Sequence, residues 1–87
     1  MLKITKYGSS WCKPCETLQK VMDEILPAYN TNVEYESIDV EEEYELADKM
    51  NIKGVPTVIF EKDGEVVLRF MGTKSSNEIK ELIDKHV

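Results

Sequence analysis

The chain of 87 residues contains only two cysteines, Cys12 and Cys15, and two residues separate them. They follow a strand-like apolar segment and precede an amphipathic helical pattern, so Cys12 is expected where the first turn of a helix begins. Backbone N–H groups there lack intrahelical partners, and the helix dipole favours negative charge. A thiol in this position ionises more easily, and the thiolate is the nucleophile of disulfide exchange. Cys15, one turn further along, could then attack a disulfide formed on Cys12.

Two other interpretations of the cysteine pair are open. A structural zinc site needs four ligands, and only His86 is left to help the two cysteines. A structural disulfide, or a pair of unreactive thiols, is the second alternative. The order of strand, C-x-x-C and helix favours a redox dithiol over both. We therefore expect no metal and no cofactor beyond the Cys12–Cys15 disulfide.

Length and composition limit the organisation of the chain and its partners. Eighty-seven residues make one domain, residues 1–87, with no room for a second core. Seventeen acidic and eleven basic residues give a net charge of −6, which argues against nucleic acid or an anionic membrane as the main partner. No segment has the pattern of a signal peptide or the length of a transmembrane helix. We expect a cytoplasmic monomer, and a C-x-x-C motif in that compartment is more often catalytic than structural.

Hydrophobic periodicity predicts seven elements in the order β-α-β-α-β-β-α. The segments with strand patterns are residues 2–7, 33–40, 57–61 and 66–70. Helices are predicted over residues 12–26 and 41–50, with Glu41–Glu43 in the first turn of the second and a Glu45–Lys49 pair along it. Asp63-Gly64 between apolar runs predicts a hairpin, and the S-x-x-E sequence that starts at Ser75 predicts the cap of a last helix. A crossover helix makes the first two strands parallel.

With this order of elements the chain resembles the thioredoxin-fold family over nearly its whole length. The residues that carry the resemblance are Trp11-Cys12-Lys13-Pro14-Cys15, Gly54-Val55-Pro56-Thr57, Asp63-Gly64 and Met71-Gly72. The resemblance implies an α/β fold with a four-stranded mixed sheet and helices on both faces. It also implies a protein-disulfide reductase in which the Cys12 thiolate attacks the substrate and Cys15 resolves the mixed disulfide. The partners would be protein disulfides and a thioredoxin-reductase-like enzyme.

The family also implies a surface on which the substrate peptide lies. By resemblance the Val55–Pro56 peptide bond is cis, and the Val55 backbone pairs with the substrate. An apolar rim would be formed by Trp11, Val55, Pro56 and Gly72. The alternatives are an ordinary trans proline at the start of an edge strand and a tryptophan packed in the core. Lys13 and Pro14, between the cysteines, are expected to modulate the dithiol, and a proline suits the start of a helix.

Two features depart from the thioredoxin pattern. The layout lacks the additional N-terminal strand and helix of a full-length thioredoxin and is closer to a glutaredoxin, so a glutathione-linked reductase is an alternative. A non-enzymatic binding or redox-sensing module is another. Lys6 stands where thioredoxins have a buried aspartate, six residues before the first cysteine, that relays protons for the second. Lys6 either extends into solvent from the strand end or places a cation near the dithiol, where it would stabilise the thiolate.

Overall fold

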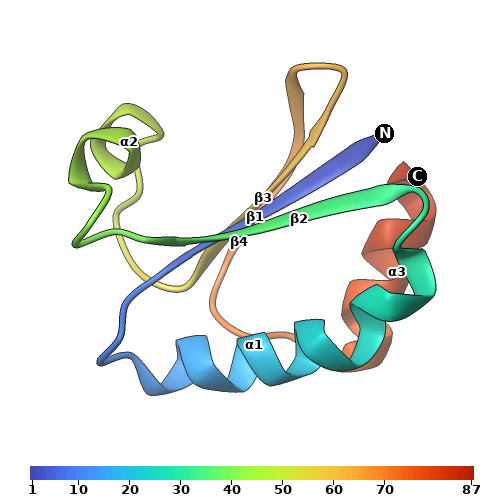
Figure 1. Cartoon of the computed structure of the whole chain (residues 1–87), viewed down its shortest axis with the longest axis horizontal. Coiled ribbons are helices and arrows are strands. Elements are labelled where there is room, and N and C mark those ends of the chain that lie inside the picture. The colour runs from blue at the N-terminus through green and yellow to red at the C-terminus, as the bar shows by residue number, and fades with distance from the viewer.

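The computed structural model describes all 87 residues. Its elements follow the predicted order with one addition, the 3₁₀ turn η1 (Figure 1). The bounds are β1 Leu2–Gly8, α1 Lys13–Ile25, η1 Leu26–Tyr29, β2 Val33–Asp39, α2 Tyr44–Lys49, β3 Thr57–Lys62, β4 Glu65–Met71 and α3 Ser76–His86. No helix is long and apolar enough to cross a membrane.

The four strands form one mixed sheet in the order β2-β1-β3-β4. β1 is parallel to β2 and antiparallel to β3, and β3 is antiparallel to β4. Helices α1 and α3 lie on one side of this sheet and α2 lies on the other (Figure 1). The predicted four-stranded mixed sheet with helices on both faces is therefore confirmed.

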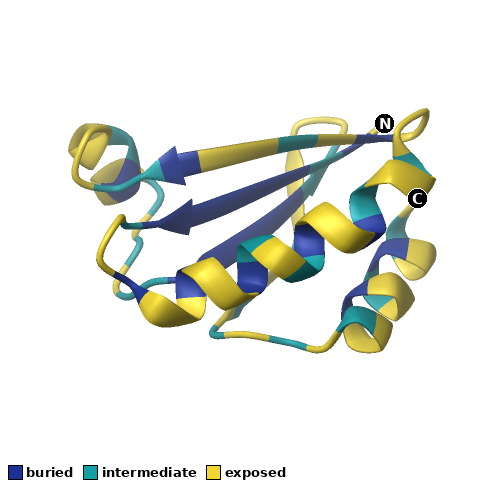
Figure 2. Cartoon of the chain, turned by 60° about the horizontal axis from the view of Figure 1, so that its bottom comes forward, coloured by how far each residue is buried: buried dark blue, intermediate teal, exposed yellow.

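Each face of the sheet carries its own apolar layer. The larger core lies between the sheet and the helices α1 and α3 and buries Leu18, Met22, Ile79 and Ile83 completely. The buried residues of α1 lie on one face of the helix, and the residues between them in sequence are mostly exposed, as the helical periodicity predicts (Figure 2). A smaller cluster of Tyr7, Ile38 and Ile59 lies under α2. These two layers fix the orientation of β1, whose C-terminal end leads to the cysteines.

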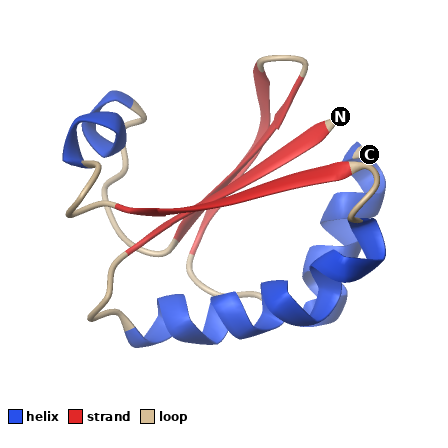
Figure 3. Ribbon diagram, viewed as in Figure 1, coloured by secondary structure: helices blue, strands red, loops and turns tan.

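The second helix is shorter than predicted. It begins at Tyr44, and the three glutamates before it belong to the connection from β2 (Figure 3). The Asp39 carboxylate accepts the N–H of Glu41 at 2.8 Å, and the Asp39 carbonyl accepts the N–H of Glu43 at 2.9 Å. These bonds hold a turn in place of the first helical turn, because an aspartate side chain competes for nearby backbone donors. The predicted Glu45–Lys49 ion pair is also absent; the two ion pairs present are Lys3–Glu36 and Lys13–Glu16.

The hairpin and the last helix agree with their sequence signals. Asp63 and Gly64, between β3 and β4, have positive φ angles of 54° and 83°, as a two-residue hairpin turn requires. Helix α3 begins with a complete capping box. The hydroxyl of Ser75 accepts the N–H of Glu78 at 3.2 Å, and the Glu78 carboxylate accepts the N–H of Ser75 at 3.0 Å.

Candidate active site

The two cysteines lie at the junction between β1 and α1 and are joined by a disulfide, with their Cα atoms 5.2 Å apart. Helix α1 begins at Lys13, one residue later than predicted, so Cys12 is its N-cap and not part of its first turn. The backbone N–H of Cys15 donates a hydrogen bond of 3.2 Å to the Sγ of Cys12. Pro14 occupies the first turn, where its missing N–H leaves no bond unmade. Cys12 therefore has its sulfur at the positive end of a helix, where a thiolate is stabilised.

Three chain segments meet at the edge of the sheet where β1 ends. Tyr7 of β1 is opposite Thr57 of β3, and Thr57 is opposite Met71 of β4. The connection from β1 to the cysteines therefore lies at the same end of the sheet as Pro56, which precedes β3, and Gly72, which follows β4. The N–H of Gly72 donates a hydrogen bond of 2.9 Å to the carbonyl of Pro56, which ties the second and third segments together.

The residues expected to form the rim have different exposures. Trp11 is 70% exposed and Met71 is 63% exposed, so the alternative of a core tryptophan is wrong. Pro56 is buried, and the Val55–Pro56 peptide bond is cis. Gly72 has a φ of 91°, a conformation that favours glycine. Two large apolar side chains are therefore open to solvent at this edge of the sheet.

Lys13 and Lys6 lie in very different surroundings. The Lys13 side chain is 90% exposed, and its Nζ lies 3.5 Å from a carboxylate oxygen of Glu16. Lys6 is only 6% exposed, although it lies beside a surface cavity. Side chains alternate along a strand, and Lys6 therefore shares the α1 face of β1 with Ile4. Burial lowers the pKa of Lys6, while the negative charge of Asp23 on α1 opposes this effect.

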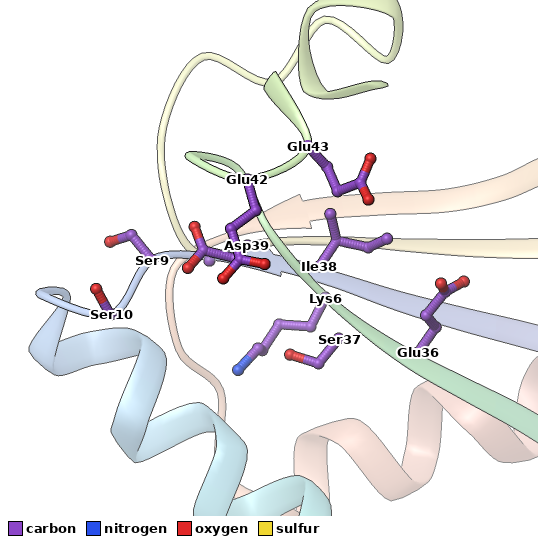
Figure 4. A pocket seen from close by; sticks show the side chains of 10 residues that line it. Lys6, Ser9, Ser10, Glu36, Ser37, Ile38, Asp39, Glu42 and Glu43 are labelled. Atoms are coloured by element: carbon purple, nitrogen blue, oxygen red, sulfur yellow. The ribbon is translucent and has the colours of Figure 1, made fainter. Parts of the chain in front are cut away.

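Lys6 also borders a polar surface cavity of about 460 Å³ (Figure 4). The cavity lies between the end of β1, β2 and the turn that precedes α2. Its lining residues are Lys6, Gly8, Ser9, Ser10, Glu36, Ser37, Ile38, Asp39, Glu42 and Glu43. The sequence interpretation missed this site because it placed the glutamates in a helical turn. The Ser9 hydroxyl oxygen, at the same junction, is buried without a hydrogen-bond partner.

Gly8 is a second residue that the sequence interpretation missed. A Cβ atom on Gly8 would lie 3.1 Å from the Sγ of Cys15 and 3.3 Å from its Cβ. Such distances are shorter than ordinary van der Waals contacts, so a side chain on Gly8 would push against the dithiol. The sequence marks Gly8 only as a residue of the turn after the strand. The reason for a glycine at this position becomes visible only when α1 packs against the end of β1 and brings Cys15 next to Gly8.

Comparisons with known proteins agree with this geometry. The family model described as Thioredoxin matches residues 2–85. The thioredoxin of Bacillus subtilis is 32% identical over 84 residues, which are 97% of this chain and 81% of that protein. The X-ray structure of Fasciola hepatica thioredoxin superposes with a TM-score of 0.90 at 29% identity, covering 99% of this chain and 81% of that one. A segment of the NADPH-dependent thioredoxin reductase 3 of Arabidopsis thaliana is 36% identical over 78 residues, which are 90% of this chain and 15% of that protein.

The site and these matches lead to the same conclusion. The only two cysteines are close enough to form a disulfide, and one of them caps a helix that follows a central strand. The sheet around them has the thioredoxin topology. The chain belongs to the thioredoxin family and is a thiol–disulfide oxidoreductase, a protein-disulfide reductase whose redox group is the Cys12–Cys15 pair.

Proposed function

We propose that Cys12 is the nucleophile of this reductase and that Cys15 is the resolving thiol. The observation that carries the assignment is the hydrogen bond from the N–H of Cys15 to the Sγ of Cys12, at the N-terminus of α1. After reduction the same donor and the helix dipole favour a thiolate on Cys12. Cys15 lies inside the helix, on its buried stripe with Leu18 and Met22.

The reaction proceeds by two exchanges. The Cys12 thiolate attacks one sulfur of the substrate disulfide, and the other substrate sulfur leaves as a thiolate that takes a proton from solvent. Cys15 then loses its proton and attacks the Sγ of Cys12, which releases the first substrate sulfur. The substrate gains two electrons and two protons, and the Cys12–Cys15 disulfide forms.

The substrate peptide is proposed to lie across Trp11, Val55, Pro56 and Gly72. Two observations support this surface. Trp11 offers a large exposed apolar side chain beside Cys12. The backbone N–H and carbonyl of Val55 make no hydrogen bond within the chain, so both groups are free to pair with an extended peptide. Pairing of this kind recognises backbone rather than side chains, which suits a reductase that acts on several protein disulfides.

We also propose that a thioredoxin-reductase-like enzyme reduces the Cys12–Cys15 disulfide after each turnover. The likeness to a segment of the Arabidopsis thioredoxin reductase supports this assignment. The protein is proposed to act in the cytoplasm as a monomer, without nucleic acid or membrane as a partner. The net charge of −6 supports the exclusion of anionic partners.

Insulin reduction tests the proposal when it is run with two electron sources in parallel. One reaction contains thioredoxin reductase and NADPH, and the other contains glutathione, glutathione reductase and NADPH. Turnover in the first reaction supports the proposed function, whereas turnover only in the second indicates a glutaredoxin-type enzyme. Reversible formation of the Cys12–Cys15 disulfide without insulin reduction would indicate a redox-sensing module.

Trapping tests the roles of the two cysteines. Cys15→Ser should still attack a substrate disulfide and should then stop as a mixed disulfide, which a non-reducing gel detects. Cys12→Ser should neither trap the substrate nor reduce it. The opposite pattern, with trapping by Cys12→Ser alone, would reverse the assignment.

A further inference from the structure

The position of Lys6 is unusual for a lysine. Lys6 is opposite Val58 of β3, which is fully buried, and its side chain runs beside Ser37 towards α1 (Figure 4). Its ammonium group makes no hydrogen bond, and neither of the two ion pairs in the chain includes it. Most of the Lys6 side chain is buried, and its amino group borders the cavity. Burial of this kind disfavours the charged form of a lysine.

The neighbour of Lys6 across the end of β1 is Cys15. Measured from a Cβ atom placed on Gly8, the Sγ of Cys15 lies at 3.1 Å, and the Cε of Lys6, which bears the ammonium nitrogen, lies at 3.6 Å. The Sγ and Cε atoms can be no farther apart than the sum of these two distances. The ammonium nitrogen is one bond beyond Cε, so it lies within about 8 Å of the sulfur. This limit is comparable to the Debye length at physiological ionic strength, so salt screens the two groups only in part.

The other charged residues that line the cavity with Lys6 are acidic, and one of them, Glu36, pairs with Lys3. Lys6 is the only basic side chain among the residues that line the cavity. The acidic groups come from every element packed around it: Asp23 of α1, Glu36 and Asp39 of β2, and Glu42 and Glu43 of the turn before α2. A second negative charge on Cys15 would be repelled by these carboxylates, because like charges disfavour ionisation of a nearby acid. The Lys6 ammonium is the basic group of the cavity lining that offsets this repulsion.

The two sulfurs differ in the groups that can stabilise them. The Cys12 sulfur already accepts the N–H of Cys15 at the helix N-terminus. No hydrogen-bond donor reaches the Cys15 sulfur, and the side of this sulfur that faces β1 is turned to Gly8 and Lys6. The Cys15 sulfur therefore has no donor of its own, and the Lys6 cation is the group near it that can stabilise a thiolate.

We propose that Lys6 is a positioning residue for the resolving step, because its ammonium stabilises the thiolate of Cys15. The inference rests on the proposed role of Cys15 as the resolving thiol. In this step the Cys15 thiol gives its proton to water in the cavity, and the thiolate attacks the Sγ of Cys12. Lys6 keeps its protons throughout. It also favours the reduced form over the disulfide, because only the reduced form carries the thiolate.

The charge effect is tested on Cys15 alone in a Cys12→Ala background. The rate of alkylation is followed against pH for this protein and after further substitution by Lys6→Gln, Lys6→Arg or Lys3→Gln. Lys6→Gln should raise the pKa of Cys15 by about one unit or more, and Lys6→Arg should restore most of the difference. Lys3→Gln removes a cation from the same strand that pairs with Glu36, and it should leave the curve in place. If the alkylation curves with and without Lys6→Gln were superimposable, the proposal would be overturned.

The kinetic effect is tested with the reduced chain and an aromatic disulfide that releases a coloured thiolate. The first release reports the attack by Cys12, and the second reports the resolution by Cys15. Lys6→Gln should slow the second release about tenfold at pH 7 and change the first by less than twofold, because a shift of one pKa unit is a factor of ten in thiolate. Slowing of the first release alone would move the action of Lys6 to Cys12 and overturn the proposal.

Two controls separate this proposal from others. Lys6→Met, checked by circular dichroism for an unchanged fold, should reproduce the Lys6→Gln kinetics, because both remove the charge. Failure of Cys15→Ser to trap insulin would refute the proposed function and leave the alkylation curves unaffected. An unchanged pKa of Cys15 would refute the role of Lys6 while the trapping result stands.

Discussion

The Sγ of Cys15 lies 3.1 Å from the point that a Cβ atom on Gly8 would occupy, so the last residue of β1 and the first turn of α1 are in direct contact. A side chain at position 8 would fit only if Cys15 moved by a few tenths of an ångström. The contact fixes the second cysteine against the end of a central strand and leaves Lys6 on the other side of the same glycine. A methyl group added at position 8 would therefore act directly on the dithiol.

Gly8→Ala should destabilise the oxidised protein by about 1–2 kcal/mol, because the added methyl group overpacks a site that a disulfide and a helix hold in place. The midpoint and slope of urea unfolding measure the effect. Reduction of the disulfide by dithiothreitol should also become faster, since the strain falls on the Cys15 side of the bond.

Gly54→Ala is the matched control for the glycine experiment. Its Cβ atom would lie 2.8 Å from the Sδ of Met71, which is closer than the contact at Gly8. Met71 is 63% exposed and its side chain is flexible, so it can turn away. We expect a loss below about 0.5 kcal/mol in urea unfolding. An equal loss for both variants would mean that Cys15 gives way as easily as Met71.

Lys6→Met should make the oxidised protein more stable at pH 7, by about 1 kcal/mol, since burial of the Lys6 side chain disfavours its charge. The value is at the low end of the range for such groups because the amino group borders an open cavity. A residue that lowers stability while it assists the dithiol would be an example of the trade-off between stability and activity that is common at active sites. Urea unfolding of both proteins at pH 7 checks the direction.

The same substitution should change how stability depends on alkaline pH. Burial lowers the folded-state pKa of Lys6, so between this pKa and the unfolded value of about 10.4 the unfolded chain holds a proton that the folded chain has lost. Stability contributed by this group therefore rises with pH across that window. The advantage of Lys6→Met over the natural chain should shrink between pH 7 and pH 10. A constant difference would mean that the pKa of Lys6 is the same in both states.

Much of this fold follows from sequence patterns, and the exceptions have physical causes. The order of elements follows from apolar periodicity, and the Asp63-Gly64 turn and the Ser75 cap follow from local backbone chemistry. For Lys6 two local rules conflict. Alternation with Leu2 and Ile4 places it on the core face, while the general rarity of buried lysine predicts exposure, and alternation prevails.

The parts of the site that sequence could not supply depend on contacts between distant residues. The need for glycine at position 8 depends on where Cys15 lies after α1 packs. The acidic lining of the cavity depends on the Asp39 turn, which keeps Glu42 and Glu43 out of helix α2. Neither relationship has a short-range signal in the chain.

Trp11→Ala should weaken the reduction of protein disulfides without changing the redox chemistry of the dithiol. Loss of a large exposed anchor should lower kcat/KM for insulin on the order of tenfold. The equilibrium of the Cys12–Cys15 pair with glutathione should be unaffected. Tyr44→Ala is the matched control, because Tyr44 is 67% exposed but lies on α2. Equal losses for the two variants would argue against a specific substrate surface at Trp11.

Ser75→Ala should cost about 1 kcal/mol of stability at pH 7, because the hydroxyl caps the N–H of Glu78. Urea unfolding of the two proteins measures the loss.

Glu78→Gln tests the other half of the capping box by its pH dependence. The backbone N–H and the hydroxyl of Ser75 lower the pKa of Glu78 in the folded chain. A depressed folded-state pKa contributes stability above the unfolded value of about 4.3, and that stability is lost as the pH falls through the folded pKa. The difference between the natural chain and Glu78→Gln in urea unfolding should thus be present at pH 7 and vanish at low pH. Glu81→Gln, on the same helix but outside the capping box, should show no comparable difference at pH 7. If Glu81→Gln lost as much stability as Glu78→Gln, the effect would belong to the charge of the helix and not to its cap.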